Sequence, residues 1–488
     1  MEIMPSLEEV RSFTGSGEYR YVPVATSIMS DIRTPMEVLR ILKNVSDHTY
    51  MLESMENNEN RGRYTFLGFD PKMEITCVNG TVKAGEKIYE NAHPGKIIRE
   101  IIREHKSPKL DFLPPFAGGL VGYFSYDYVK YAEPSLDLSA QDREGFKDVD
   151  LMLFDKVIAF DSLMQKMILI VNIKLSDIEN EYERAKTDLA SLIDLIRNGK
   201  PGEEKPGKLL SDIRPFFSSE EYCGMVERAK HYIKEGDIFQ VVLSNRFEAD
   251  YEGSLLNVYR ILRTTNPSPY MFYFSGTDVE VAGASPETLV KLDGDTLYTY
   301  PLAGTRPRGE TAEEDLRLEE ELLSDPKELS EHNMLVDLGR NDIGKISKFG
   351  SVNVRELHTI LRFSHVMHIG STVKGTIRPE CDAVDAVDAI LPAGTLSGAP
   401  KIRACQIINE LENNKRGIYG GAIGYMDLSG NLDTCIGIRI AYKKGNRVFV
   451  RSGAGIVYDS VPEKEYRETL NKAAAVINAI KAAQDEEI

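Results

Sequence analysis

The chain has 488 residues, 42% of them hydrophobic and 28% charged, and carries a net charge of −17 with a pI near 5.1. Such a length predicts two or three lobes or one unusually large one, and the acidic balance argues against nucleic-acid binding, which needs a positive field. Five scattered cysteines without a CxxC pair, no secretion signal and no apolar run near the ~20 residues of a membrane helix favour a cytoplasmic protein without disulfides, zinc or membrane contact.

The first 200 residues are predicted to form a smaller N-terminal lobe of helices and strands. Apolar periodicity predicts helices at 35–45, 95–105 and 176–197, and strands at 49–54, 63–69, 151–160 and 166–174. The stretch 198–210, NGKPGEEKPGKLL, is rich in glycine, proline and charge without any periodicity, which is typical of a linker. It divides the chain into a lobe at 1–200 and a second domain at 211–488.

Beyond the linker the same patterns alternate. Helices are expected at 218–235, 255–264 and 312–323, and strands at 239–247, 270–274, 279–283, 288–292 and 296–300. A similar motif occurs in both parts of the chain, as GGLVGY at 118–123 and GGAIGY at 420–425. Each segment could be a strand whose glycines allow another backbone or a ligand to approach closely. Duplication, similar packing needs and chance all remain open as explanations.

The segment 324–342 is predicted to contain a helix that carries acidic residues on one face. Asp325 is expected to cap it, with Pro326 at the first helical position and Gly339 at its end. Glu328 and Glu331 are three residues apart and therefore project from one side. Two such carboxylates repel each other unless a cation or hydrogen-bond donors lie between them.

A second acidic pair, Glu465 and Glu468, follows Pro462 at the start of another predicted helix. Two helical carboxylate pairs suit a hard, octahedral cation, for which Mg²⁺ is the leading candidate. The simpler interpretation of each pair is a solvated acidic helix face.

An arginine lies in a strand-like segment of small residues. In the segment 435–441, CIGIRIA, alternation puts three isoleucines on one face and Arg439 on the other, beside Gly437 and Ala441. A guanidinium with room in front of it can bind a carboxylate through two hydrogen bonds. The alternative is an edge-strand arginine in solvent.

Three further segments could meet an anion or a proton. Gly453–Gly455 in RSGAG is either a nest of backbone N–H donors or a tight turn. Pro400 opens a helix whose first amides could face an anion. His368 shares a strand face with Val366, Gly370 and Thr372, where a histidine is either structural or, given its neighbours, chemical.

Taken together, the motifs resemble the chorismate-utilising enzymes, and within them the anthranilate synthases of the component I type. The resemblance runs in order through nearly all of 210–470 and more thinly through the N-terminal part. The segments that carry it are MLES (51–54), RGRYTFLGF (61–69), FAGGLVGYFSYD (116–127), GDIFQVVLSNRF (236–247), NPSPYMF (266–272), SPETLV (285–290), PLAGTRPRG (301–309), ELSEHNMLVDLGRND (328–342), SHVMHIGS (364–371), PAGTLSGAPK (392–401), YGGAIGY (419–425) and RSGAGIVYDS (451–460).

The resemblance implies roles for matching residues and an α+β fold in which two β-rich layers face each other, with helices outside and chorismate in the crevice. It implies Mg²⁺ bound by Glu331 and Glu468, with Glu328 and Glu465 nearby. The residues that it makes catalytic are His368, Glu287 and Thr305, with Glu287 protonating the C4 hydroxyl as it leaves. The implied chorismate contacts are Gly304, Thr305, Tyr419, Arg439, Gly453, Ala454 and Gly455.

Two positions distinguish branches of this family. Isochorismate and salicylate synthases are similar but carry a water-activating lysine where Gln240 stands, and aminodeoxychorismate synthases commonly carry a nucleophilic lysine where Ala303 stands. The absence of both lysines favours the branch that adds ammonia and yields anthranilate and pyruvate. The alternatives are an aminodeoxychorismate synthase component I and a tryptophan sensor that has lost catalysis.

The resemblance also implies feedback regulation and a partner. Ser54 in MLES and the segment Pro269, Tyr270 and Met271 match the tryptophan effector site of the family, although MLES alone could be a buried strand end. No glutaminase-like cysteine with a partnered histidine is evident in the sequence. We therefore expect a separate glutamine amidotransferase subunit that supplies ammonia, in a hetero-tetramer.

Overall fold

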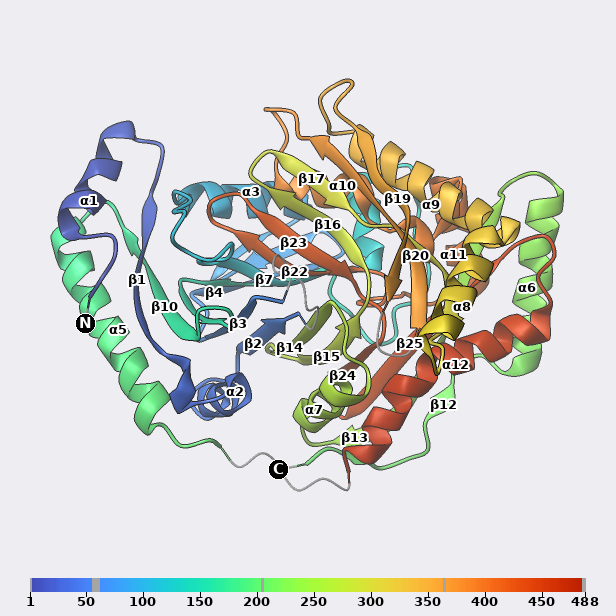
Figure 1. The fold of residues 1–488 in the computed structure, drawn as a ribbon, viewed down its shortest axis with the longest axis horizontal. Coiled ribbons are helices and arrows are strands. Elements are labelled where there is room, and N and C mark those ends of the chain that lie inside the picture. The colour runs from blue at the N-terminus through green and yellow to red at the C-terminus, as the bar shows by residue number, and fades with distance from the viewer. Residues whose placement is uncertain (1, 55–61, 203–205, 363–365, 485–488) are drawn as a thin grey trace.

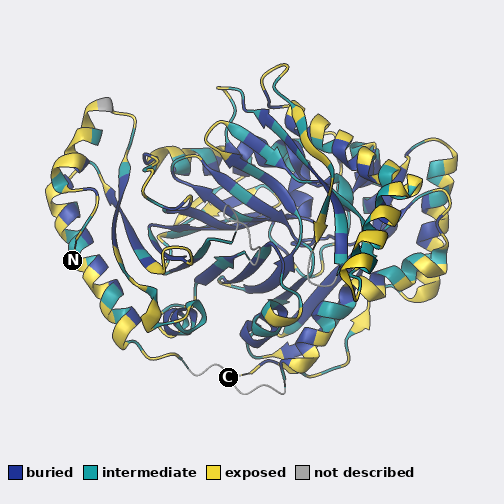
Figure 2. Ribbon diagram, viewed as in Figure 1, coloured by how far each residue is buried: buried dark blue, intermediate teal, exposed yellow. Residues whose placement is uncertain are grey.

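The computed structural model describes all residues except 1, 55–61, 203–205, 363–365 and 485–488. It is an α+β protein in which two large antiparallel sheets lie at the centre and helices cover them (Figure 1). The strands are mostly buried, while the outer faces of the helices are exposed (Figure 2). The described residues contain no helix long and apolar enough to cross a membrane.

The first sheet has 13 strands and takes them from both ends of the chain. Its strands, in spatial order, are β1 (Tyr21–Met29), β10 (Lys166–Lys174), β9 (Lys156–Asp161), β3 (Tyr64–Phe69), β2 (Thr49–Glu53), β14 (Tyr270–Ser275), β15 (Val279–Ser285), β24 (Ile440–Lys444), β25 (Arg447–Ile456), β13 (Gln240–Glu252) and β11 (Lys208–Leu209), with β12 (Arg214–Pro215) and β21 (Gly398–Ala399) also paired to β13.

The second sheet has 12 strands and is equally shared. Its strands, in spatial order, are β18 (Leu302–Pro307), β20 (Val366–Thr376), β17 (Thr296–Thr299), β16 (Thr288–Asp293), β23 (Leu432–Ile436), β22 (Ala422–Asp427), β7 (Gly119–Phe124), β8 (Val149–Phe154), β4 (Met73–Val78), β5 (Thr81–Ala84) and β6 (Lys87–Tyr89), with β19 (Asn353–Arg362) paired to β20.

The helices pack on the outer faces of the sheets. They are α1 (Leu7–Ser12), α2 (Pro35–Lys43), α3 (Pro94–Glu104), α4 (Val129–Ala132), α5 (Ile178–Asn198), α6 (Ser219–Lys234), α7 (Leu256–Thr265), α8 (Ala312–Ser324), α9 (Pro326–Gly344), α10 (Ala383–Ile390), α11 (Lys401–Glu412) and α12 (Pro462–Ala482), with short 3₁₀ turns η1 (Phe13–Ser16), η2 (Ser30–Ile32), η3 (Tyr126–Tyr128) and η4 (Gly394–Leu396).

Three apolar cores explain this layering. Between the sheets lies an aromatic core to which β2, β3, β14 and β24 of the first sheet and β7, β8 and β22 of the second contribute rings such as Tyr50, Phe66, Phe154, Phe274 and Tyr425. On the outer side of the first sheet α2, α5, α7 and α12 bury their apolar stripes. On the outer side of the second sheet α3, α9 and α10 do the same. Apolar burial on both faces of each sheet drives the assembly.

Both sheets run across the predicted linker. In the first sheet β2 pairs with β14, and in the second β7 pairs with β22. Strands from 1–200 and from 211–488 thus form continuous ladders. The division of the chain into two functional domains remains a prediction.

The chain crosses from one sheet to the other at four short corners, of which the first is the segment 70–72 between β3 and β4. The other three are Asp155 between β8 and β9, the pair Pro286 and Glu287 between β15 and β16, and the segment 437–439 between β23 and β24. The predictions of continuous strands at 151–160 and 435–441 are therefore wrong. The inward-facing residues shift by one position at Asp155, from Met152 and Phe154 to Val157 and Ala159. The sequence does not reveal the change of sheet because both faces of each sheet are buried, so apolar residues continue through the corner.

The helix of the first acidic pair is longer than predicted. Asp325 caps it, accepting hydrogen bonds from Lys327 N–H and Glu328 N–H at 3.0 and 3.4 Å, as the sequence indicates. Gly339, however, does not end α9, which continues to Gly344. A Cβ at Gly339 would lie 3.1 Å from the Thr299 methyl, so this glycine serves close packing of α9 on the second sheet.

The two GGxxGY motifs lie on neighbouring antiparallel strands, β7 and β22, which confirms the prediction of strands with close backbone contacts. Gly122 of β7 lies opposite Gly424 of β22. A Cβ on Gly424 would lie 2.1 Å from the Asp433 carbonyl oxygen, and one on Gly122 would lie 2.1 Å from that of Asp150. These glycines allow the strands to approach at the centre of the second sheet.

We expect Gly424→Ala to lower the thermal unfolding midpoint, because the added methyl must push β22 and β23 apart, at a cost of about 1–3 kcal/mol. Gly224→Ala is the matched control. Gly224 lies inside α6 with nothing within 4 Å of an added Cβ, so this change should stabilise the protein slightly. The unfolding midpoints are measured by circular dichroism, and equal midpoints for the two variants would contradict this explanation.

Candidate active site

Two of the four corners carry candidate site residues and are hydrogen-bonded to each other. Ile436 N–H donates to Glu287 O at 2.9 Å, and Ala284 N–H donates to Arg439 O at 3.2 Å. Arg439 has φ = 52°, in the left-handed region that non-glycine residues rarely adopt. This conformation costs about 1–3 kcal/mol and persists only where the surroundings fix it, which is typical of functional sites.

The corner environment changes the acidity of Glu287. Burial raises the pKa of this carboxyl to about 7, although a hydrogen bond and nearby cations oppose the shift. Thr395 Oγ1 donates that bond to Glu287 Oε1 at 3.0 Å, and the cations are Arg439 and Lys472. A carboxyl with a pKa near neutrality can hold and release a proton at physiological pH, which suits a general acid.

His368 is held in one tautomer by the strand beside it. Its Nδ1 lies 2.9 Å from the Gly304 carbonyl oxygen and 3.0 Å from Thr305 Oγ1. A carbonyl oxygen only accepts, so Nδ1 carries the proton and Nε2 is the acceptor of the neutral ring. Burial lowers the pKa of His368, and the Arg439 charge lowers it further, so the neutral form is favoured.

Gly304, whose carbonyl contacts His368, forms a bulge in the neighbouring strand. It is the extra residue of a bulge in β18, between the pairs Ala303 with Ile369 and Thr305 with His368, and its φ is +65°. A Cβ there would lie 3.2 Å from Glu328 Oε2. The bulge therefore lies between His368 and the acidic face of α9.

Gly453–Gly455 is neither a nest nor a tight turn. All three residues belong to β25 and pair with β13, which occupies much of their backbone hydrogen bonding. A Cβ on Gly453 would lie 2.8 Å from Tyr419 Oη, and one on Gly455 would lie 2.7 Å from Gln240 Nε2. The glycines make room beside these two buried side chains, while Ala454 points into the core on the other face.

The acidic residues of α9 and α12 lie near enough to influence one another electrostatically. Glu331 is exposed at the surface, but partial desolvation by its neighbours raises its pKa, as do the charges of Glu328 and Glu468. Burial and Glu468 likewise raise the pKa of Glu465. Lys472 lies on the same side of α12, with its Nζ 2.6 Å from Glu468 Oε1 and 3.2 Å from Gly453 O.

Crowded carboxylates of this kind fit a divalent cation, which would relieve their repulsion. Among the described residues no three His, Cys, Asp or Glu side chains are grouped so that they could hold an ion. Mg²⁺ usually takes only one or two protein carboxylates and completes its shell with water and substrate, so the donor set fits this ion.

The predicted effector residues lie on adjacent strands. Ser54 directly follows β2, whose Glu53 pairs with Met271 of β14, and Pro269 directly precedes β14. Met271 is only 1% exposed and faces the outer core, whereas Tyr270 faces the core between the sheets. The Tyr270 hydroxyl donates to Asp433 Oδ1 at 2.8 Å and lies 2.9 Å from Thr288 Oγ1.

Two residues that act on Glu287 were not predicted from the sequence. Thr395 lies in the motif PAGTLSGAPK, but nothing in the pattern indicates that it contacts Glu287, 108 residues earlier. Lys472 lies one helical turn after Glu468, a spacing that could have indicated an ion pair.

The model of the chorismate binding enzyme family matches residues 47–478. The chain therefore belongs to the chorismate-binding enzyme family, which confirms the resemblance of the motifs.

Relatives are similar over almost the whole length. The anthranilate synthase component 1 of Aquifex aeolicus (strain VF5) is 44% identical over 495 residues, with 99% of both chains covered. That of Acetivibrio thermocellus is 43% identical over 492 residues, which cover 98% of this chain and 99% of the relative. The crystal structure of anthranilate synthase component I from Streptococcus pneumoniae TIGR4 is 37% identical, with a TM-score of 0.77 over 92% of this chain and 98% of that one. The predicted fold of two facing layers is thereby confirmed.

We expect the Glu287 carboxyl to lose its proton near pH 7 rather than near its ordinary value of 4.5, because burial disfavours the charged form. Thr395→Val should raise this pKa further, since the lost hydrogen bond stabilises the carboxylate, whereas Thr395→Ser should keep it. Infrared titration would show the change as an acid carbonyl band that is absent in Glu287→Gln. A band that disappears by pH 5 in the wild type would contradict the assignment.

Proposed function

We propose that the chain is the chorismate-converting subunit of an anthranilate synthase. It would convert chorismate and ammonia to anthranilate, pyruvate and water. The observation that carries this proposal is the environment of Glu287, whose carboxyl has a pKa of about 7. The positive charge of Arg439 lowers the pKa of Glu287 and also that of His368, so the three side chains influence one another electrostatically. The similarity to anthranilate synthases over nearly the full length supports it.

In this proposal the three side chains have separate tasks. Protonated Glu287 gives its proton to the C4 hydroxyl, which leaves as water while ammonia adds at C2. Arg439 binds a substrate carboxylate, for which its half-buried guanidinium is suited. His368, neutral and with Nε2 as acceptor, takes up the ring proton when pyruvate is eliminated and the ring becomes aromatic.

Glu331 and Glu468, with Glu328 and Glu465 beside them, would hold Mg²⁺. When bound, the ion supplies a positive charge that orients a carboxylate-bearing substrate. Gly304, Thr305, Tyr419 and the segment Gly453–Gly455 would complete the substrate contacts.

The nucleophile is proposed to be free ammonia. Gln240 lies beside Gly455, and Ala303 lies in β18 next to the bulge, so neither position offers the lysine found in the related branches. We further propose a separate glutamine amidotransferase subunit as the source of ammonia, in a hetero-tetramer. The relatives are themselves named component 1, which supports a partner component.

The direct test is anthranilate fluorescence from the purified chain with chorismate, Mg²⁺ and an ammonium salt. Mass analysis should identify anthranilate as the product, with no isochorismate from water. Aminodeoxychorismate or isochorismate as the main product would move the chain to another branch. No turnover at all would favour the alternative of a catalytically dead sensor.

We expect Glu331→Gln and Glu468→Gln each to raise the Mg²⁺ concentration needed for half-maximal activity by at least about tenfold. Mutation of a residue that only supports a metal ligand already lowers metal affinity about tenfold or more. The reason is that each variant removes one of the charges that Mg²⁺ would neutralise. Glu463→Gln on the exposed side of α12 is the matched control. Wild-type Mg²⁺ dependence in either site variant would exclude that glutamate as a ligand.

Hydrogen bonds connect the proposed tryptophan site to the corners that carry Glu287 and Arg439. Ser54 and the segment 269–271 line the seam between β2 and β14. The Tyr270 hydroxyl contacts Thr288, the residue after Glu287, and Asp433, which lies on the strand that leads to Arg439. A ligand that displaced Tyr270 would therefore act on both corners, and such coupling is typically worth about 1–3 kcal/mol.

We expect tryptophan to raise the apparent KM for chorismate in the wild type, and Ser54→Phe to remove this effect by filling the pocket without abolishing catalysis. Tyr270→Phe should still bind tryptophan in calorimetry but inhibit less, because the hydroxyl link is lost. Tyr50→Phe is the control, since that buried hydroxyl has no hydrogen-bond partner among the described residues. Equal inhibition of Tyr270→Phe and wild type would exclude the link, and an uninhibited wild type would exclude the effector site.

A further inference from the structure

Asp127 is a buried carboxylate that the proposed chemistry does not use. It lies in η3, directly after β7, and is only 5% exposed. Its Oδ2 accepts a hydrogen bond of 2.8 Å from Gly417 N–H, 290 positions further along the chain. Tyr126 N–H donates to Gly417 O at 2.9 Å. Two consecutive residues of the N-terminal half therefore hold both backbone polar groups of Gly417.

The backbone at Gly417 is fixed by this contact. Its φ is +60°, in the left-handed region, and a Cβ there would lie 3.0 Å from the Phe146 ring. Only glycine fits this conformation without strain. Asp127 and Phe146 thus hold the 417 position from two sides.

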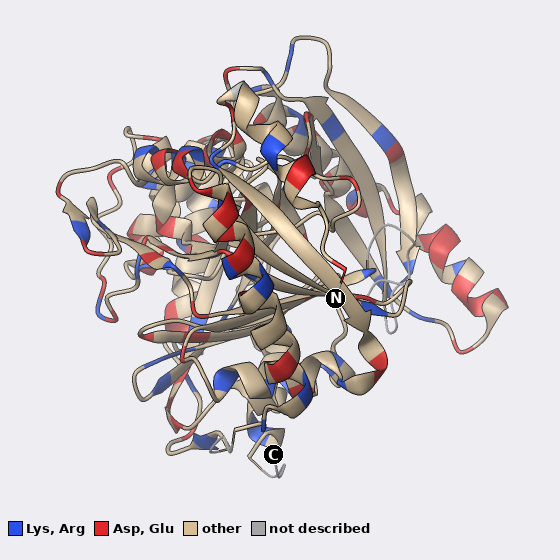
Figure 3. Ribbon diagram, turned by 90° about the vertical axis from the view of Figure 1, so that its left-hand side faces the viewer, with Lys and Arg blue, Asp and Glu red and all other residues tan. Residues whose placement is uncertain are grey.

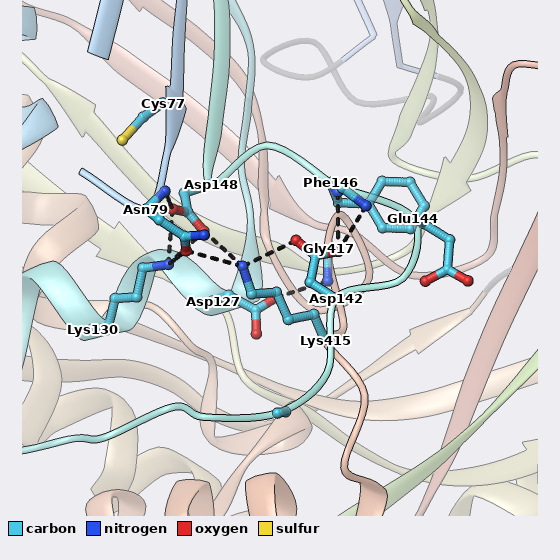
Figure 4. Close-up of polar contacts among 12 residues, drawn as sticks. Cys77, Asn79, Asp127, Lys130, Asp142, Glu144, Phe146, Asp148, Lys415 and Gly417 are labelled. Atoms are coloured by element: carbon cyan, nitrogen blue, oxygen red, sulfur yellow. Dashed lines mark hydrogen bonds and ion pairs between the residues drawn. The ribbon is translucent and has the colours of Figure 1, made fainter. Parts of the chain in front are cut away.

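Lys415 is held from the same half of the chain (Figure 4). Its Nζ lies 3.2 Å from Asn79 Oδ1, 3.2 Å from Asp142 Oδ2 and 4.0 Å from Asp148 Oδ1. Asp148 also pairs with Lys130 at 2.8 Å. Buried charges are stable only when they are paired in this way, so the network ties Lys415 firmly to the N-terminal half.

The segment 415–421 leads from this network to the candidate active site. The guanidinium of Arg416 lies 5.8 Å from the centre of the Tyr419 ring. Gly420 N–H donates to Gly437 O, and Gly437 N–H donates to Gly421 O, each at 2.8 Å. The same short segment therefore carries Tyr419 and supports the corner at 437–439.

We propose that Asp127 is a positioning residue for chorismate binding: by holding Gly417 it fixes the segment 415–421, and with it Tyr419 and the Arg439 corner. This inference rests on the proposed function. It gives the N-terminal half a part in substrate binding that is separate from the proposed tryptophan site.

The physical reason is the unpaired amide that would remain without Asp127. A buried N–H without an acceptor is costly, so the segment would shift to find another partner. A displaced Tyr419 weakens contacts made in the ground state and the transition state alike. Such a change raises KM and leaves kcat largely intact.

The test compares Asp127→Ala and Asp127→Asn with a matched control, Asp427→Ala. Asp427 is also buried, at 4% exposed, and accepts Ala117 N–H at 2.8 Å across 310 positions, but it lies at the far end of β22. Lys415→Met is a second probe of the same segment that leaves Asp127 in place. Kinetics with chorismate, ammonium and Mg²⁺ are measured for each folded variant, together with its thermal unfolding midpoint.

We expect Asp127→Ala to raise the KM for chorismate about tenfold, the factor that corresponds to losing one buried hydrogen bond. kcat should change little, Asp127→Asn should restore KM because its amide oxygen still accepts, and Lys415→Met should raise KM. Asp427→Ala should lower the unfolding midpoint without changing KM.

An unchanged KM in folded Asp127→Ala, or an equal rise in Asp427→Ala, overturns the inference. If Asp127→Ala does not fold, an unchanged KM in Lys415→Met overturns it. A wild-type protein that does not convert chorismate would instead overturn the proposed function.

Discussion

The decisive constraint in this protein is that one chain must build two facing sheets around a shared aromatic core. Facing sheets lie about 10 Å apart, so a chain that changes sheet within a few residues must turn sharply at the edge of the core. Two of the four corners carry Glu287 and Arg439, and the other two carry Lys72 and Asp155, which form an ion pair of 3.1 Å. The reactive groups thus lie on irregular backbone that two rigid sheets support, as precise positioning requires.

A fully buried ion cluster stiffens the structure behind the candidate site. Glu412 accepts hydrogen bonds from Arg416 Nη2 at 2.5 Å and Arg451 Nη2 at 2.6 Å, and all three residues are at most 2% exposed. Arg416 also donates to the Leu396 and Val242 carbonyls at 2.6 and 2.7 Å. Breaking such a cluster would leave an uncompensated charge, so it links α11, β25 and the segment before Tyr419 firmly.

Local patterns predicted most elements of this fold because caps and periodicity are local properties. The Asp325 cap, the helix after Pro462 and the strand of His368 are all observed. The corners were not predicted because alternation cannot show which sheet a strand joins. The role of Gly339 was predicted wrongly because its packing against β17 cannot be inferred from the sequence of the helix. Of the candidate site, the residues followed from the resemblance, whereas the contacts of Thr395 and Asp127 depend on partners more than 100 positions away.

The shared sheets also limit how an effector could act. A hinge between the two halves would have to break the ladder between β7 and β22, which aligns six residue pairs, and that between β2 and β14, which aligns five. Each backbone hydrogen bond contributes about 0.5–1.5 kcal/mol net, so opening both ladders would cost more than the 1–3 kcal/mol of ordinary allosteric coupling. A ligand at the β2–β14 seam would therefore act by small displacements that leave the ladders intact. The corners at Glu287 and Arg439, where the regular hydrogen bonding is already interrupted, are the places that can yield to such displacements.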